Sequence, residues 1–195
     1  MPCPDRTQPD RLRPLGALLV PLLAVAGCAA PPPTGPHLVL PQGTHWTGDS
    51  LQARQHRDWL LGSMVVCLDR PGAVRVTKVQ ALGGDLEVTG FALRPNPAGT
   101  GASMLGSSVD TFVSEGLDPG AATVTAVCGS APAAGDELIV RLHSDGTATT
   151  KAEGLSVTYV SDGTSGQLAI PVGLVMCIKP PEDPECTVQP PSGSS

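Results

Sequence analysis

The sequence predicts an all-β protein, an antiparallel β-sandwich of immunoglobulin-like type. Apolar and polar residues alternate with a period of two over much of residues 64–177, which is the pattern of half-buried strands. Turn signals rich in Gly, Asp and Ser separate seven or eight such stretches at close spacing, and no stretch has the period of a long helix. Short, closely spaced strands of this kind favour a sandwich over a barrel.

Composition supports one folded domain and excludes several classes of protein. The chain has 195 residues, and 41% of them are hydrophobic, which is enough for a single core. The residue pattern excludes a collagen, a coiled coil and a polytopic membrane protein. The formal net charge of −6 argues against nucleic acid as a partner, because such proteins usually carry a basic surface.

Residues 1–27 have the order of a secretory signal peptide. Arginines occur in the first 14 residues, an apolar stretch follows over 15–27, and small residues end it. That stretch is shorter than the roughly 20 residues that span a bilayer, and Pro21 interrupts it. A permanent transmembrane helix is therefore not expected here.

The end of this segment, Val25-Ala-Gly-Cys28, resembles the lipobox of bacterial lipoproteins. The resemblance implies that the Cys28 thiol takes a diacylglycerol, such as one carrying palmitate, and becomes the N-terminus after cleavage. Several acyl chains on one cysteine give stable anchoring, whereas a single chain is marginal. The expected location is the extracytoplasmic face of the cell membrane, with the lipid bilayer as a partner through acylated Cys28.

Three further segments are expected in the mature chain. Residues 28–45 contain the lipidated cysteine and a Pro-rich tether, which tends to extended polyproline II conformation. Residues 46–186 form the β-sandwich domain, and residues 187–195 form a disordered tail by composition. A short helix is expected at 49–61, where Leu51, Gln55 and Trp59 recur at intervals of four.

The strands are expected in the following order. They start with a central apolar strand at 64–68 and continue with alternating stretches at 74–77, 86–93, 122–128, 138–143, 147–151, 155–159 and 168–177. The phase of alternation changes at Gly90, which predicts a bulge. Pro171 predicts an edge strand or a break in the ladder.

Turn signals connect these strands. Gly83-Gly84 predicts a hairpin turn, and further turns are expected at 144–146 and 161–163. Residues 94–110 are long and rich in Gly, Pro and Ser, and loops of that length are either mobile or functional.

The remaining cysteines predict two disulfide bonds. Cys67, Cys128, Cys177 and Cys186 lie in the exported domain, and four cysteines allow three connectivities. Cys177 and Cys186 are close enough in sequence to form a local bond, which would leave Cys67 with Cys128. No Cys-x-x-Cys pair occurs, so a structural metal site on these residues is not expected.

No catalytic constellation is visible, and neither a cofactor nor a metal is expected. His143-Ser144-Asp145 contains three triad residue types, but they share one turn and cannot converge from separate elements. The acidic run 182–185 lacks the ligand spacing of a calcium loop, which favours a solvated turn. Aromatic side chains are 3% of the chain, so a stacking surface would require Trp46 and Trp59 to be exposed together.

Two segments resemble secreted actinobacterial lipoproteins of unknown function. They are residues 59–79, which include the run Val-Val-Cys-Leu-Asp-Arg-Pro-Gly, and the run Gly-Leu-Val-Met-Cys177. The resemblance implies the location outside the membrane and supplies no activity.

The leading hypothesis is a non-catalytic, membrane-anchored module that binds another envelope protein or component. Two alternatives remain open. One is an enzyme or accessory subunit whose site is assembled from scattered residues such as Asp69, Arg70 and His56. The other is a carrier of a small molecule or a metal ion.

Overall fold

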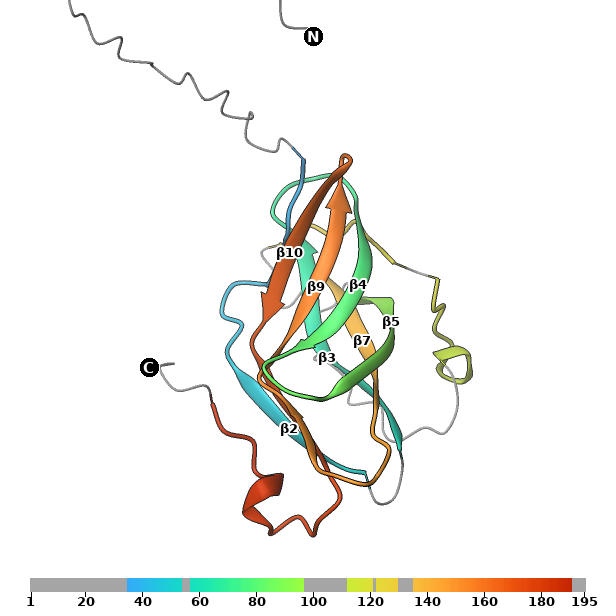
Figure 1. Cartoon of the computed structure of the whole chain (residues 1–195). Helices are drawn as coiled ribbons and strands as arrows, with labels where there is room; N and C mark the ends of the chain where they lie inside the picture. The colour runs from blue at the N-terminus through green and yellow to red at the C-terminus, as the bar shows by residue number, and fades with distance from the viewer. Residues whose placement is uncertain (1–34, 54–56, 97–111, 121, 130–134, 191–195) are drawn as a thin grey trace, which may run out of the picture. The chain divides into compact units, whose positions relative to one another are not determined.

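A computed structural model describes residues 35–53, 57–96, 112–120, 122–129 and 135–190, which form an almost entirely β-stranded domain (Figure 1). The first sheet is antiparallel and has the strand order β1 (Leu38–Val39), β3 (Asp58–Leu68), β7 (Gly135–His143) and β5 (Glu87–Asn96). The second is also antiparallel, in the order β10 (Thr164–Ile170), β9 (Gly154–Ser161), β4 (Val74–Leu82) and β6 (Thr123–Val124). The sequence-based prediction of an antiparallel β-sandwich is confirmed.

A third sheet, which the sequence did not predict, has the order β2 (Thr47–Gln52), β11 (Val172–Cys177) and β8 (Thr150–Ala152). β11 pairs with β8 antiparallel but with β2 parallel, so Thr47 lies opposite Val172. Two short 3₁₀ helices, η1 (Phe112–Glu115) and η2 (Pro184–Cys186), complete the described elements. Among the described residues, no helix has the length and apolar character needed to cross a bilayer.

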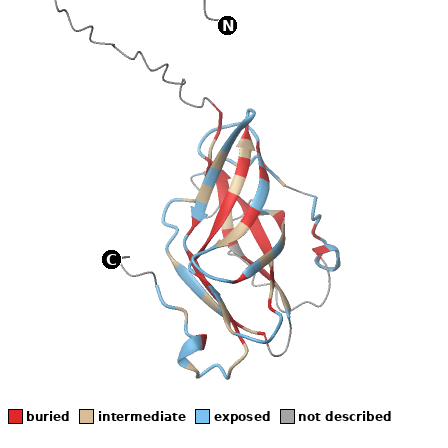
Figure 2. Ribbon diagram, viewed as in Figure 1, coloured by how far each residue is buried: buried red, intermediate tan, exposed pale blue. Residues whose placement is uncertain are grey.

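The core lies between the sheets because alternate residues of each strand point inward (Figure 2). On β7, Leu138, Val140 and Leu142 face the core and are fully buried. On β9, Leu155 and Val157 face them from the second sheet and are equally buried. The period-two pattern therefore identified the residues that face the core on both strands.

Two smaller apolar clusters lie outside this core. Leu60, Ala92 and Ile139 face outward from the first sheet, and Phe112 and Leu117 from the η1 region cover them. Val175 and Cys177 on β11 contact Cys186 and Val188 from the C-terminal segment. Short segments thus cover part of the outer faces of the first sheet and of β11, which the alternation alone did not indicate.

The prediction of a helix at 49–61 is wrong. The described part of this stretch forms β2 and the beginning of β3, which pair with β11 and β7. The spacing of four residues between Leu51, Gln55 and Trp59 did not reflect a helical face, because the side chains of Leu51 and Trp59 contact the core from strands. Helices in proteins depend on packing of a broad apolar face, and the apolar stripe here was too thin to compete with strand pairing.

The predicted hairpin at Gly83-Gly84 is also wrong, although the chain does turn there. β4 belongs to the second sheet and β5 to the first, so the turn carries the chain between layers. Gly83 and Gly84 have φ values of 61° and 157°, which favour glycine. The Lys151 carbonyl accepts the N–H groups of Asp85 and Leu86 at 3.0 Å each and holds this crossing in place.

Three other local features, a bulge, a hairpin turn and a break between strands, occur where the sequence predicted them. A bulge interrupts the β5–β7 ladder between Val88 and Gly90, as the phase change predicted. Asp162 and Gly163 form the β9–β10 hairpin, both with positive φ, as a type I′ turn requires. Pro171 separates β10 from β11, which lie in different sheets, so the predicted break is confirmed.

Two predicted strands differ from the observed ones. The stretch 122–128 contains only the short strand β6, followed by an isolated bridge between Val127 and Leu68. The strand after the 144–146 turn is β8, which pairs with β11 and does not return along β7. Local alternation shows that a residue is half-buried, but it does not identify the partner strand.

The domain is longer than 46–186. Leu38 and Val39 pair with Leu68 and Cys67, and Leu38 is buried, so the second half of the predicted tether belongs to the sandwich. At the other end, Val188 packs on the β11 cluster, so the predicted tail begins too early at 187. Of the expected loop at 94–110, residues 97–110 lie outside the described residues, as do residues 1–34 with Cys28.

Candidate functional site

The four domain cysteines form the two predicted disulfide bonds. Cys67 in β3 bonds to Cys128 with a Cα–Cα distance of 5.1 Å, and Cys177 bonds to Cys186 at 5.5 Å. Cys67 and Cys177 are fully buried. The first bond ties the first sheet to the segment that follows β6, and the second fixes η2 against β11. Both are structural bonds of the kind found in exported domains.

Of the scattered residues suggested for an enzyme site, the structure describes Asp69 and Arg70, which are exposed at the end of β3. Asp69 forms an ion pair with Arg70 at 3.0 Å and accepts the backbone N–H of His37 at 2.8 Å. The hydrogen bond from Arg70, with the one from His37, lowers the pKa of the Asp69 carboxyl. Asp69 therefore fastens the start of the domain to the end of β3, and His56 lies outside the described residues.

The two tryptophans do not share one surface. The Trp46 ring covers Gly173, where an added Cβ would lie 2.7 Å from Trp46 Cζ2. Gly173 and its partner Gly48 thus leave room for the ring on the third sheet. Trp59 contacts the main core from β3. The condition for an aromatic stacking platform is therefore not met by this pair.

The turn His143-Ser144-Asp145 is a local structure, as expected. The Ser144 hydroxyl accepts the Gly146 N–H at 3.2 Å, and the Asp145 carboxylate accepts both the hydroxyl and the N–H of Thr147. These hydrogen bonds from Thr147 lower the pKa of Asp145. The Ser144 hydroxyl thus takes part in a hydrogen bond within the turn.

The acidic run before Cys186 also behaves as a solvated turn. The Lys179 ammonium lies 2.9 Å from the Glu185 carboxylate and 3.7 Å from that of Asp183. Asp183 also accepts the Glu185 N–H at the start of η2. Within the described ranges, no group of three or more His, Cys, Asp or Glu side chains is arranged to hold a metal ion.

A hollow formed by described residues lies between β5 and η1. We call it the β5–η1 pocket; it has a volume of about 470 Å³ and is lined by Thr89, Gly90, Phe91, Phe112, Val113, Pro119 and Arg141. Volumes of 300–1,000 Å³ are typical of small-molecule sites. Its lining residues come from three separate parts of the chain, so only the fold brings them together.

Local geometry explains why a pocket forms there. The bulge makes Thr89 the extra residue of β5, and Gly90 presents no side chain to the space above it. The Phe112 ring occupies part of that space, because a Cβ on Gly90 would lie 3.1 Å from Phe112 Cε2. Phe112 is held by the outer apolar cluster, while the next residue, Val113, is 67% exposed. One wall is therefore fixed and apolar, and its rim is open to solvent.

Arg141 is the charged residue of the pocket. Its Nε donates to the Thr89 hydroxyl at 2.8 Å, and that hydroxyl lies 3.4 Å from the Arg141 carbonyl oxygen. Thr89 therefore fixes the direction of the guanidinium while leaving its terminal nitrogens for another acceptor. Among the described residues, no carboxylate forms an ion pair with Arg141.

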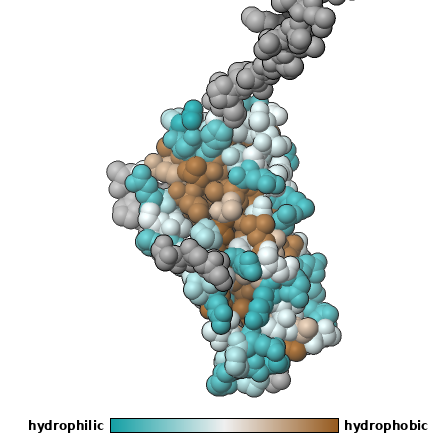
Figure 3. All heavy atoms as spheres, turned by 60° about the vertical axis from the view of Figure 1, so that its left-hand side comes forward, coloured by the Kyte–Doolittle hydropathy of each residue, from teal (hydrophilic) through white to brown (hydrophobic). Residues whose placement is uncertain are grey.

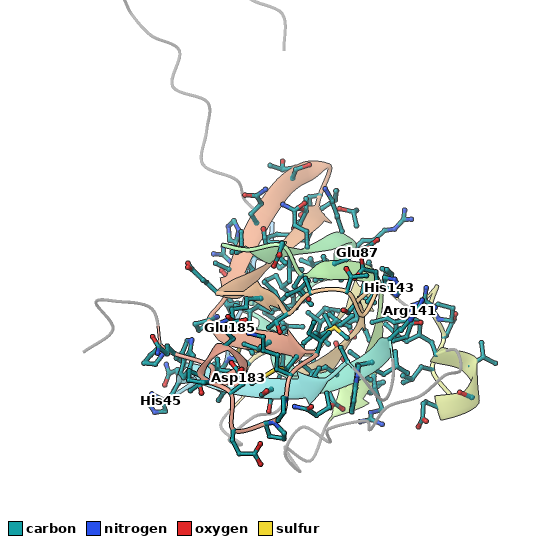
Figure 4. All side chains as sticks on the ribbon, turned by 60° about the horizontal axis from the view of Figure 1, so that its bottom comes forward. His45, Glu87, Arg141, His143, Asp183 and Glu185 are labelled. Atoms are coloured by element: carbon teal, nitrogen blue, oxygen red, sulfur yellow. A yellow bond between two sulfur atoms is a disulfide. The ribbon has the colours of Figure 1, made fainter. Side chains whose placement is uncertain are left out.

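A histidine–aspartate pair lies on the same outer face. His143 Nδ1 is 3.0 Å from Asp58 Oδ1, and the strand register places Glu87 opposite His143. Figure 4 shows Glu87, His143 and Arg141 close together, coming from β5 and β7. The sequence did not indicate Asp58 as the partner of His143, because Asp58 lay in the predicted helix.

Two acidic residues near the other end of β7 are buried. Glu137 is 2% exposed and pairs with Arg94, whose Nε lies 2.9 Å from its carboxylate. Burial raises the pKa of Asp136, which also accepts hydrogen bonds from the backbone of Thr125 and Ala126. Both acids therefore hold neighbouring segments against the sheet.

A second hollow and an apolar edge lie elsewhere on the described surface. A hollow of about 310 Å³ lies between β8, β11 and residues 184–189, and the C-terminal segment itself forms one of its walls. The side of the domain that carries β10 shows apolar atoms at the surface (Figure 3). There β1 and β10 meet at the edges of their sheets, and Leu40 and Leu168 are only partly buried over the core.

The β5–η1 pocket is thus the strongest candidate site, with an apolar wall and one oriented cation. No protein-family model, no curated protein and no solved structure matches this chain.

Proposed function

We propose that this protein is a lipid-anchored binding module on the extracytoplasmic face of a bacterial cell membrane. Its lipobox-like residues 25–28 and its likeness to secreted actinobacterial lipoproteins support the location. The two disulfide bonds support an oxidising compartment, since such bonds persist outside the cytoplasm.

The observation that carries the binding role is the β5–η1 pocket. An open pocket with apolar walls and few polar groups is the usual form of a ligand site. Strand pairing holds the β5 and β7 residues of the pocket on a rigid sheet. Phe112 belongs to the outer apolar cluster, which holds the η1 side of the pocket in place. Val113 leaves an apolar side chain at the rim for a partner to cover.

A crosslinked pull-down of the tagged protein from intact cells tests this proposal. One dominant envelope component is expected, and it should be lost with Cys28→Ala, which releases the domain from the membrane. Val113→Asp should also lose it, because a charge at the rim opposes burial. Val127→Asp is the matched control, since Val127 is 38% exposed and lies away from the pocket. Enrichment of nothing by the unaltered protein would refute binding of an envelope component.

A further inference from the structure

We infer that the β5–η1 pocket binds a small carboxylic acid with a single apolar arm, either aryl or branched alkyl. The inference rests on the proposed binding function and adds the chemical class of the ligand.

The walls of the pocket select an apolar group. Phe112, Val113 and Pro119 contribute to its lining, together with Phe91 of β5, which also packs against the main core. Burial of an apolar group against such residues is favourable in proportion to the area removed from water. A hydrophilic ligand such as a sugar would lose hydration there and gain few hydrogen bonds in return.

The single cation selects an anionic head group. Among the described residues that line the pocket, only Arg141 has a charged side chain. Its terminal guanidinium nitrogens, directed by the bond from Nε to Thr89, match the two oxygens of a carboxylate. The neighbouring carboxylate of Asp58 is engaged by His143.

The size of the pocket fits one small molecule. Its volume of about 470 Å³ lies in the lower half of the range found for small-molecule sites. A head group at Arg141 would place the apolar arm against the Phe112 ring, which lies over Gly90. The two ends of the ligand therefore have separate, fixed positions.

Three probes of matched shape test the ligand class. The full chain carrying Cys28→Ser, which has no lipid in which a probe could dissolve, is titrated with 4-phenylbutyrate, 4-phenylbutylamine and 4-phenylbutanol. Binding is followed by NMR of valine methyl groups, with Val127 as an internal reference far from the pocket. The acid should shift the Val113 signals in a saturable way, and the amine should bind at least about tenfold more weakly.

Variants separate the contributions of charge and apolar surface. Arg141→Gln should weaken binding of the acid by about tenfold or more and leave binding of the alcohol unchanged. Arg75→Gln is the matched control, because Arg75 is exposed on β4 and lies outside the pocket. Val113→Asp should weaken binding of all three probes, and Val127→Asp should not.

Several results would overturn the inference. They are the absence of any Val113 shift with the acid, equal affinity for acid and amine, or an Arg141→Gln variant that binds the acid normally. If the pull-down still finds an envelope partner in these cases, the binding role stands and only the ligand class is wrong. Normal acid binding with an empty pull-down would instead support the ligand class and refute the partner.

Discussion

Removal of the two disulfide bonds should destabilise the domain by clearly different amounts. The Cys67–Cys128 bond closes a loop with a sequence separation of 61, and the Cys177–Cys186 bond closes one of 9. In the chain-entropy model, these loops correspond to about 4.3 and about 2.6 kcal/mol of stability at 25 °C. The long-loop bond should therefore contribute more by about 1.7 kcal/mol.

Paired alanine variants measure this difference by urea unfolding with linear extrapolation. One variant carries Cys67→Ala with Cys128→Ala, and the other carries Cys177→Ala with Cys186→Ala. The first pair removes the buried sulfur of Cys67, and the second removes those of Cys177 and Cys186, so only part of the loss from packing cancels in the comparison. The unaltered protein unfolded under reducing conditions provides the control, since it loses both bonds without a substitution. An equal or larger loss for the short-loop pair would refute the entropic reasoning.

Three further predictions concern single positions. Gly90→Ala should push the Phe112 ring aside, because the new Cβ would lie 3.1 Å from it, and calorimetry should show weaker binding of 4-phenylbutyrate with a loss of about 1 kcal/mol in stability. Gly173→Ala should cost about 1–3 kcal/mol and displace the Trp46 ring, which a red shift of tryptophan fluorescence would report. Burial raises the pKa of Asp136, so the ionised form is disfavoured in the folded state and the free energy of unfolding falls as pH rises above 3.8. Asp136→Asn should remove that contribution, and an unchanged pH profile of unfolding would contradict it.

The sequence predicted the fold class because strand alternation is a local signal. Leu138, Val140 and Leu142 on β7, and the hairpin at Asp162-Gly163, were recognised from neighbouring residues alone. The two disulfide bonds followed from the close spacing of one pair. Each of these features depends on residues that are near one another in the chain, except the Cys67–Cys128 bond, which has a sequence separation of 61 and was the pair that remained.

The errors have a different origin, because they concern which strand pairs with which. The stretch at 49–61 became β2 and part of β3 through pairing with β11 and β7, which lie more than half the domain away in sequence. Gly83-Gly84 turns between layers because β5 pairs with β7 and β4 with β9. Local propensity is weak beside such pairings, so it could not identify them.

The candidate site was beyond prediction for the same reason. Thr89 and Gly90 come from β5, Phe112 from η1 and Arg141 from β7. The sequence signalled only the bulge at Gly90 and the outward direction of neighbouring residues on β7. A pocket is defined by the space between such segments, and that space exists only once the sheet has formed.

The parallel pairing of β2 with β11 has a consequence for the order in which the molecule folds. Thr47 near the start of the domain needs Val172 near its end before the third sheet can close. Contacts between distant parts of a chain form slowly, since a long loop must be ordered first. β2 therefore remains without its partner strand until residues 172–177 have been synthesised.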